Sequence, residues 1–159
     1  MGEPRTFEVF FEDNRRRLFG AFCLISGNRQ EAEEIVQDAF LKIWERWERV
    51  SGLEDPAGFL FATAMNLFRN RVRRASLALR KPVISSLRSD DLAAVEDRDE
   101  LVHALAPLTP RQRAALVLSD YLGYPSDEAA RVLGIEPSTV RALSAKGRVA
   151  ARRSSGGRP

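Results

Sequence analysis

The residues between positions 126 and 148 have the spacing of a helix-turn-helix, a motif that can place one helix in the major groove of DNA. This motif needs a small residue where its helices cross, a residue that tolerates positive φ in the turn, and an apolar residue inside the second helix. Ala130, Gly134 and Val140 meet these needs in that order. With Val140 and Leu143 turned inward, the outer face of the second helix would carry Ser138, Thr139, Arg141, Ala142, Ala145, Lys146 and Arg148.

This outer face suits contact with duplex DNA. Small and hydroxyl side chains near the helix start permit close approach to base edges, and cations further along can bind phosphates. A helical hairpin that packs against another protein is the alternative. Residues 131–159 carry seven basic side chains and one acidic side chain, and this excess of positive charge favours DNA.

The segment 56–74 is a second candidate surface for nucleic acid, because its first half is apolar and its second half is basic. Amides can hydrogen-bond to base edges and arginines can neutralise phosphates. Phe59, Phe61 and Phe68 lie nearby and could stack on unpaired bases. A solvated basic face above an aromatic core is the alternative. The polar set expected on one broad face is Asn66, Arg69, Asn70, Arg71, Arg73 and Arg74.

The segment 29–47 has a different character, and it predicts a protein contact. Its apolar residues, Trp44 and Trp47 among them, are expected to form one buried stripe. The opposite face would present acidic and amide groups around one leucine, which suits a basic protein surface better than DNA. An ordinary solvated face is the alternative. The residues expected on this face are Glu34, Gln37, Asp38 and Leu41.

Composition excludes several other classes of function. The 159 residues carry 25 Lys+Arg and 22 Asp+Glu, with one His and one Cys. One cysteine cannot form an internal disulfide, and His103 with Cys23 cannot supply a structural zinc site. No carboxylate pair or nucleophile motif indicates an enzyme, and no cofactor is expected. The apolar runs are too short to span a membrane, so we expect a reduced, cytoplasmic protein without membrane insertion.

These surfaces need helices to position them, and helical periodicity dominates the chain. Asn28, Asp55 and Thr109 are expected to cap helix starts, and Gly27 and Gly134 are expected to end helices. The fold class is therefore all-α, with two small helical domains joined by a flexible linker. The expected boundaries are residues 6–75 for the first domain, 76–95 for the linker, 96–153 for the second domain and 154–159 for a disordered tail.

Taken together, the motifs resemble the extracytoplasmic-function (ECF) group of bacterial RNA polymerase sigma factors. The most specific similarity runs from Glu31 to Trp44, which resembles the family's region 2.2. The segment 56–74 is similar to regions 2.3 and 2.4, and residues 108–141 are similar to region 4. Leu143 and Ser144 depart from the pattern, which normally has arginine and then an apolar residue at these positions.

The resemblance implies a transcription initiation factor that has no catalytic residues of its own. It implies that Glu34, Gln37, Asp38 and Leu41 bind the β′ coiled coil of core polymerase, and that region 4 lies near the β flap. It also implies promoter DNA and an anti-sigma factor as partners. The minus-thirty-five element would be bound by the outer face of residues 137–148. The minus-ten element would be bound by Phe59, Asn66, Arg69, Asn70, Arg71, Arg73 and Arg74.

Two other classes of function are compatible with the residues alone. A stand-alone helix-turn-helix regulator would bind duplex DNA without polymerase. An all-helical adaptor would bind proteins and no nucleic acid.

Overall fold

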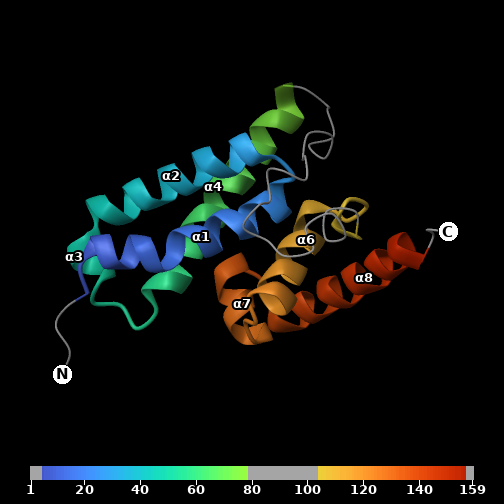
Figure 1. The fold of residues 1–159 in the computed structure, drawn as a ribbon. Coiled ribbons are helices and arrows are strands. Elements are labelled where there is room, and N and C mark those ends of the chain that lie inside the picture. Colours follow the sequence, from blue (N-terminus) through green and yellow to red (C-terminus); the bar gives the residue numbers. More distant parts are fainter. Residues whose placement is uncertain (1–4, 79–103, 157–159) are drawn as a thin grey trace.

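The computed structural model describes residues 5–78 and 104–156, and every regular element within these ranges is a helix (Figure 1). The all-α class predicted from periodicity is therefore confirmed. The helices of the N-terminal half are α1 (Phe7–Ser26), α2 (Arg29–Glu45), α3 (Trp47–Val50) and α4 (Pro56–Ala78). Those of the C-terminal half are α6 (Pro110–Leu116), the π-helix η3 (Val117–Tyr121), α7 (Ser126–Leu133) and α8 (Pro137–Gly156).

The helix starts are fixed by the side-chain caps that the sequence predicts. The Asn28 side chain accepts a hydrogen bond from the Glu31 amide at 3.0 Å, and Asp55 accepts one from the Gly58 amide at 3.0 Å. Thr109 and Gln112 form a reciprocal capping box, with a proline at the start of α6. Each cap satisfies an amide that the first helical turn leaves unpaired.

Two glycines end helices in the left-handed region. Gly27 follows α1 with φ of 72°, and its amide donates to the Cys23 carbonyl at 3.0 Å. Gly134 follows α7 with φ of 67°. Residues with a Cβ rarely adopt this conformation, so both helices end where the sequence predicts.

The core of the N-terminal half joins α1 to α2 and α4, which lie side by side in Figure 1. Phe22 packs edge-on against Phe68 of α4, with ring centroids 6.4 Å apart. Cys23 is fully buried in this core. At the end of α1 that is far from Gly27, a cluster of rings joins α1, α2 and α3, and consists of Phe7, Phe10, Phe11, Phe40 and Trp47.

Several element boundaries differ from the expected ones. The helix that was expected to reach Trp47 ends at Glu45, and Trp47 opens α3 in a new direction. Helix α4 continues to Ala78, three residues into the expected linker. Helix α8 continues to Gly156, because serine is tolerated in helices and the first strong breaker is the Gly156-Gly157 pair. The rest of the expected linker, the helix start near Glu96 and His103 lie outside the described residues.

The two halves pack against each other, which the sequence did not predict. Helix α4 contacts α7, and α1 contacts both α6 and η3. Arg17 of α1 donates a hydrogen bond to the Leu122 carbonyl at 3.2 Å and lies over the Tyr124 ring, 5.9 Å from its centroid. Phe61 of α4 meets the same Tyr124 ring edge-on at 6.1 Å.

Within the described ranges, none of the helices combines the length and the apolar character that crossing a membrane requires.

Candidate nucleic-acid and protein interfaces

The expected protein-binding face of α2 is exposed along its length. Glu34, Gln37, Asp38 and Leu41 are all exposed, and Leu41 keeps 54% of its surface accessible. Their inward neighbours on α2 include Ile35, which is fully buried. The face therefore combines two carboxylates, an amide and an apolar side chain.

Trp44 extends this face, and its predicted burial was wrong. Its side chain is 58% exposed, which makes it the most exposed of the large apolar side chains that the structure describes. Trp44 lies three residues after Leu41 and seven after Gln37, a spacing that puts all three on one side of a helix. This spacing was present in the sequence and could have identified Trp44 as a member of the face.

The two carboxylates of this face hold an arginine from α4. Arg71 donates to Glu34 at 2.6 Å and to Asp38 at 3.3 Å. Partial burial lowers the pKa of Arg71, but the hydrogen bonds and charges of the two carboxylates outweigh it and raise the pKa above its ordinary value. Arg71, expected to bind DNA, thus lies between α4 and the expected protein-binding face.

The polar residues of α4 do not share one direction. At about 100° per residue, the six side chains from Asn66 to Arg74 span roughly 200° of the helix circumference. Arg69 lies at one edge of this span, towards α7, and Arg71 lies at the other edge, towards α2. Asn66, Asn70 and Arg74 are exposed and lie between these edges.

The three phenylalanines of α4 divide in the same way. Phe59 is 37% exposed and lies above Asn66 and Asn70 on the outer face. Phe61 and Phe68 are buried, where they pack on Tyr124 and Phe22. The expectation that these two rings could stack on bases was wrong, because both belong to the core.

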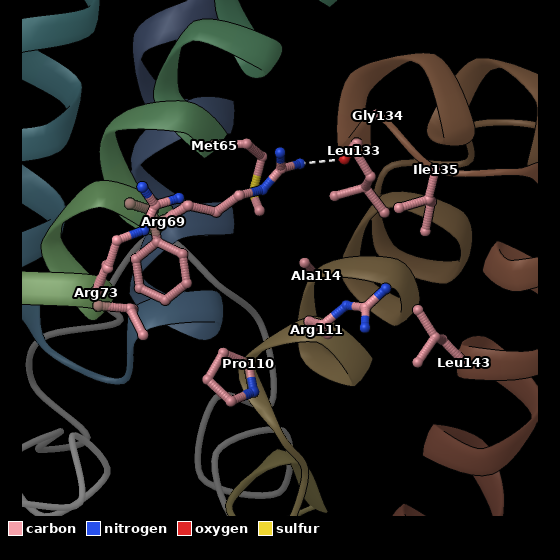
Figure 2. A pocket seen from close by; sticks show the side chains of 12 residues that line it. Met65, Arg69, Arg73, Pro110, Arg111, Ala114, Leu133, Gly134, Ile135 and Leu143 are labelled. Carbon is pink, nitrogen blue, oxygen red and sulfur yellow. Dashed lines mark hydrogen bonds between the residues drawn. The ribbon is translucent and has the colours of Figure 1, made fainter. Parts of the chain in front are cut away.

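Arg69 reaches across to the other half of the molecule. Its guanidinium donates a hydrogen bond to the Leu133 carbonyl at the end of α7 (Figure 2). Partial burial lowers the pKa of Arg69 below its ordinary value, and the positive charge of Arg111 lowers it further. The last carbonyls of a helix attract cations, so this contact is favourable even though it removes water from the guanidinium.

Helices α7 and α8 form the helix-turn-helix that the spacing predicts. The amides of Gly134 and Ile135 both point back to the Ala130 carbonyl, and this closes the turn. Ala130 is buried where the helices cross, and Val140 is fully buried inside α8. Leu143 was expected to be fully inward, but it is half-buried, and Ser144 is buried instead, 3.4 Å from the Ser119 hydroxyl.

The outer face of α8 is exposed as expected, with two qualifications. Thr139 is half-buried, whereas Ser138, Arg141, Ala142, Ala145 and Lys146 are exposed. Arg148 is exposed too, but it binds both carboxylate oxygens of Asp120 on η3, at 2.7 and 2.8 Å. These hydrogen bonds lower the pKa of Asp120 below its ordinary value, and they fasten α8 to η3.

Comparison with known proteins gives a consistent family assignment. The family model Sigma-70 region 2 matches residues 10–78, and the family model Sigma-70, region 4 matches residues 98–150. The first match contains α2 and α4, and the second contains the helix-turn-helix.

Curated relatives match most of the chain. ECF RNA polymerase sigma factor SigJ of Mycobacterium tuberculosis is 31% identical over 88% of this chain, but the chain spans only 48% of SigJ, about half of its length. ECF RNA polymerase sigma factor SigL of the same species is 28% identical over 87% of this chain and 82% of SigL.

The fold has a counterpart among solved structures. A chain in the co-crystal structure of the sigma factor RpoE with the anti-sigma factor NepR, from Bartonella quintana, matches with a TM-score of 0.78. The match covers 96% of this chain and 98% of that one at 20% identity, so it bears on the fold alone. Two sigma-70 regions in the expected order and relatives that are ECF sigma factors lead to one conclusion: the chain belongs to the ECF group of RNA polymerase sigma factors.

Proposed function

We propose that this chain binds core RNA polymerase and directs it to promoters, using α2 for the polymerase and α4 and α8 for the DNA. The observation that carries the proposal is the helix-turn-helix whose second helix exposes Arg141 and Lys146 beside small side chains. A helix of this composition can enter the major groove, contact base edges near its start and bind phosphates further along.

The outer face of α2 supports the polymerase contact. It combines Leu41 and Trp44, which are exposed, with the carboxylates of Glu34 and Asp38 and the amide of Gln37. Tryptophan is enriched at interface hot spots, and an apolar patch with a polar rim is typical of a protein interface. The acidic groups suit a basic partner and repel DNA, so this face and the DNA faces serve different ligands.

The outer stripe of α4 supports the contact with the minus-ten element. Phe59, Asn66 and Asn70 follow one another along the exposed side of the helix, with Arg74 beside them. An exposed ring can stack on an unpaired base, and the amides can hydrogen-bond to base edges. Arg69, Arg71 and Arg73 lie at the sides of this stripe, and we assign them to phosphates.

In this proposal the chain catalyses no reaction, because the polymerase performs RNA synthesis. The factor acts in the cytoplasm, where the DNA template lies. Because RpoE was crystallised with the anti-sigma factor NepR, we also propose that an anti-sigma factor controls this chain.

The test is run-off transcription from genomic fragments with core polymerase, in the presence and absence of the full chain. We expect transcripts that start at discrete positions only when the factor is present. A Gln37→Ala and Asp38→Ala double variant should bind less core enzyme and give less transcript. Factor-dependent transcripts that never appear, or specific duplex binding by the protein without polymerase, would contradict the proposal and favour a stand-alone regulator.

A further inference from the structure

A cavity of about 410 Å³ lies between the two halves and belongs to neither the α2 face nor the outer stripe of α4. Figure 2 shows α4 on one side of it, and α6, the turn after α7 and α8 on the other. Most of the lining is apolar. Met65, Phe68 and Val72 come from the N-terminal half, and Ala114, Leu133 and Leu143 come from the C-terminal half.

Three arginines also line the cavity, and none of its described lining residues is acidic. Arg69 and Arg73 extend from α4, and Arg111 extends from α6 on the opposite wall (Figure 2). Within the described residues no carboxylate pairs with any of the three, and the only hydrogen bond that binds one of them to the other half is that of Arg69 to the Leu133 carbonyl. As far as the described residues go, the cavity thus has positive charges on both walls with no carboxylate paired to them, beside an apolar floor.

The charge of Arg111 acts on Arg69 across the cavity. Partial burial and the neighbouring charge of Arg111 both lower the pKa of Arg69. An anion between these guanidinium groups would relieve the repulsion and could accept hydrogen bonds from both walls. The apolar floor in turn favours a ligand whose remaining atoms avoid water.

The size of the cavity selects a small molecule. Sites for small ligands generally have volumes of about 300 to 1,000 Å³ and apolar walls with a few convergent polar groups. The volume of about 410 Å³ lies in this range, and an acyl chain of medium length fits within it.

We propose that this cavity binds an amphipathic organic carboxylate, whose acid group lies among Arg69, Arg73 and Arg111 and whose apolar body lies against Met65, Phe68 and Leu143. Because such a ligand touches both halves, it holds them together. The binding itself does not depend on the proposed function, whereas an effect on transcription rests on it. Arg69 and Arg73 are among the arginines that the proposed function assigns to phosphates, so the ligand and promoter DNA would compete for them.

The probe is decanoate, titrated into the full chain below its micellar concentration and followed by isothermal calorimetry. We expect saturable binding of one decanoate per chain, and at least tenfold weaker binding of decanol, which has the same chain and no charge. Arg111→Gln should weaken decanoate binding about tenfold. Its matched control is Arg16→Gln, which removes the same charge from an exposed arginine of α1 and should leave the affinity unchanged.

A second variant tests the apolar part of the site. Leu143→Phe should weaken binding by filling the floor, and circular dichroism establishes whether the variant is folded. Absence of saturable binding, equal affinity for decanol, or equal loss in Arg111→Gln and Arg16→Gln would overturn the proposal. An apparent affinity that falls as protein concentration rises would overturn it too, because a second copy of the chain would then be the occupant. No polymerase is present in these assays, so their failure leaves the transcription proposal untouched.

Discussion

The two helices proposed to contact DNA are held in different ways by the rest of the molecule. Helix α8 is held from its inner side, where Val140 and Ser144 are buried, and its outer side remains exposed. Helix α4 is engaged on both flanks: Arg69 binds the end of α7, and Arg71 binds two carboxylates of α2. In this arrangement most of the outer face of α8 is ready to meet a duplex, although Arg148 is held by Asp120. By contrast, two of the arginines of α4 must first exchange protein partners for phosphates.

This difference suits the two kinds of contact. A duplex major groove accepts a rigid helix as it stands, so a preorganised α8 loses little entropy on binding. Unpaired bases become available only when the duplex opens, so α4 can remain engaged until then. Substitutions at the residues that hold each helix test this contrast.

The preorganisation of α8 depends on Val140. Val140→Asp should lower the free energy of unfolding by about 3 kcal/mol or more, because it buries a carboxylate that has no partner. The measurement is urea denaturation followed by circular dichroism. Ala142→Asp is the control, since it adds the same charge on the exposed side of α8 and should change stability by less than about 0.5 kcal/mol. Equal losses in the two variants would contradict the inward position of Val140.

Trp44 tests whether the outer face of α2, the helix that holds Arg71 of α4, binds core polymerase. Trp44→Ala should weaken binding to core polymerase by about 2 kcal/mol, because a tryptophan that becomes buried when the partner binds is a typical hot spot. Affinity can be measured by fluorescence anisotropy of labelled factor. Val9→Ala, which truncates an exposed apolar side chain on α1, should leave the affinity unchanged. An unchanged affinity for Trp44→Ala would remove this residue from the proposed face.

Arg141 and Arg148 of α8 differ in their contacts within the protein, so substituting each one distinguishes DNA contact from structural support. Arg141→Ala should weaken binding of the holoenzyme to promoter DNA by about 1 to 2 kcal/mol. It should also lower, by about one, the slope with which the logarithm of the binding constant falls with the logarithm of the salt concentration. Arg148→Ala should weaken DNA binding less, because Arg148 already binds Asp120. Core-polymerase affinity should be the same for both variants. If both lose DNA binding equally, the Asp120 pair does not restrain Arg148 in the complex.

The α7 flank of α4 can be tested without DNA. Arg69→Gln should reduce hydrogen-exchange protection at the end of α7 by about 1 kcal/mol, because the charged hydrogen bond to the Leu133 carbonyl is lost. The loss is no larger because this hydrogen bond is only partly buried. Arg73→Gln removes a charge from the same cavity but no hydrogen bond to α7, so protection there should persist. Equal effects would mean that cavity charge, and not this hydrogen bond, joins the halves.

Local chemistry explains what the sequence predicted well. The caps at Asn28, Asp55 and Thr109 and the left-handed glycines at positions 27 and 134 depend on neighbours within a few residues, and all five have the predicted role. The inward position of Val140 follows from helical periodicity in the same way.

The sequence predicted less well wherever distant segments decide the outcome. Trp47 was expected to continue the buried stripe of α2, but α2 ends at Glu45 and the chain turns into α3, which brings Trp47 against Phe7 and Phe10 of α1. Phe61 is buried because Tyr124 of the other half covers it. The different partners of Arg69 and Arg71 depend on α7 and α2 lying on opposite sides of α4, which no pattern within residues 56–74 encodes.

The smallest expected effect is the pH dependence of the pair that fastens α8. The pKa of Asp120 is lowered in the folded protein by the hydrogen bonds from Arg148. Its contribution to stability is therefore present above the pKa that an aspartate has in the unfolded chain, and it is lost as the pH falls through the lower, folded value. Both side chains are nearly half exposed, so the loss should be under about 1 kcal/mol. Urea denaturation of the native chain and of Asp120→Asn should differ at neutral pH and converge in acid. A difference that persists in acid would mean that Asp120 stabilises η3 and α8 by a route other than its charge. In that case packing alone, and not the Asp120–Arg148 ion pair, would hold α8 in place.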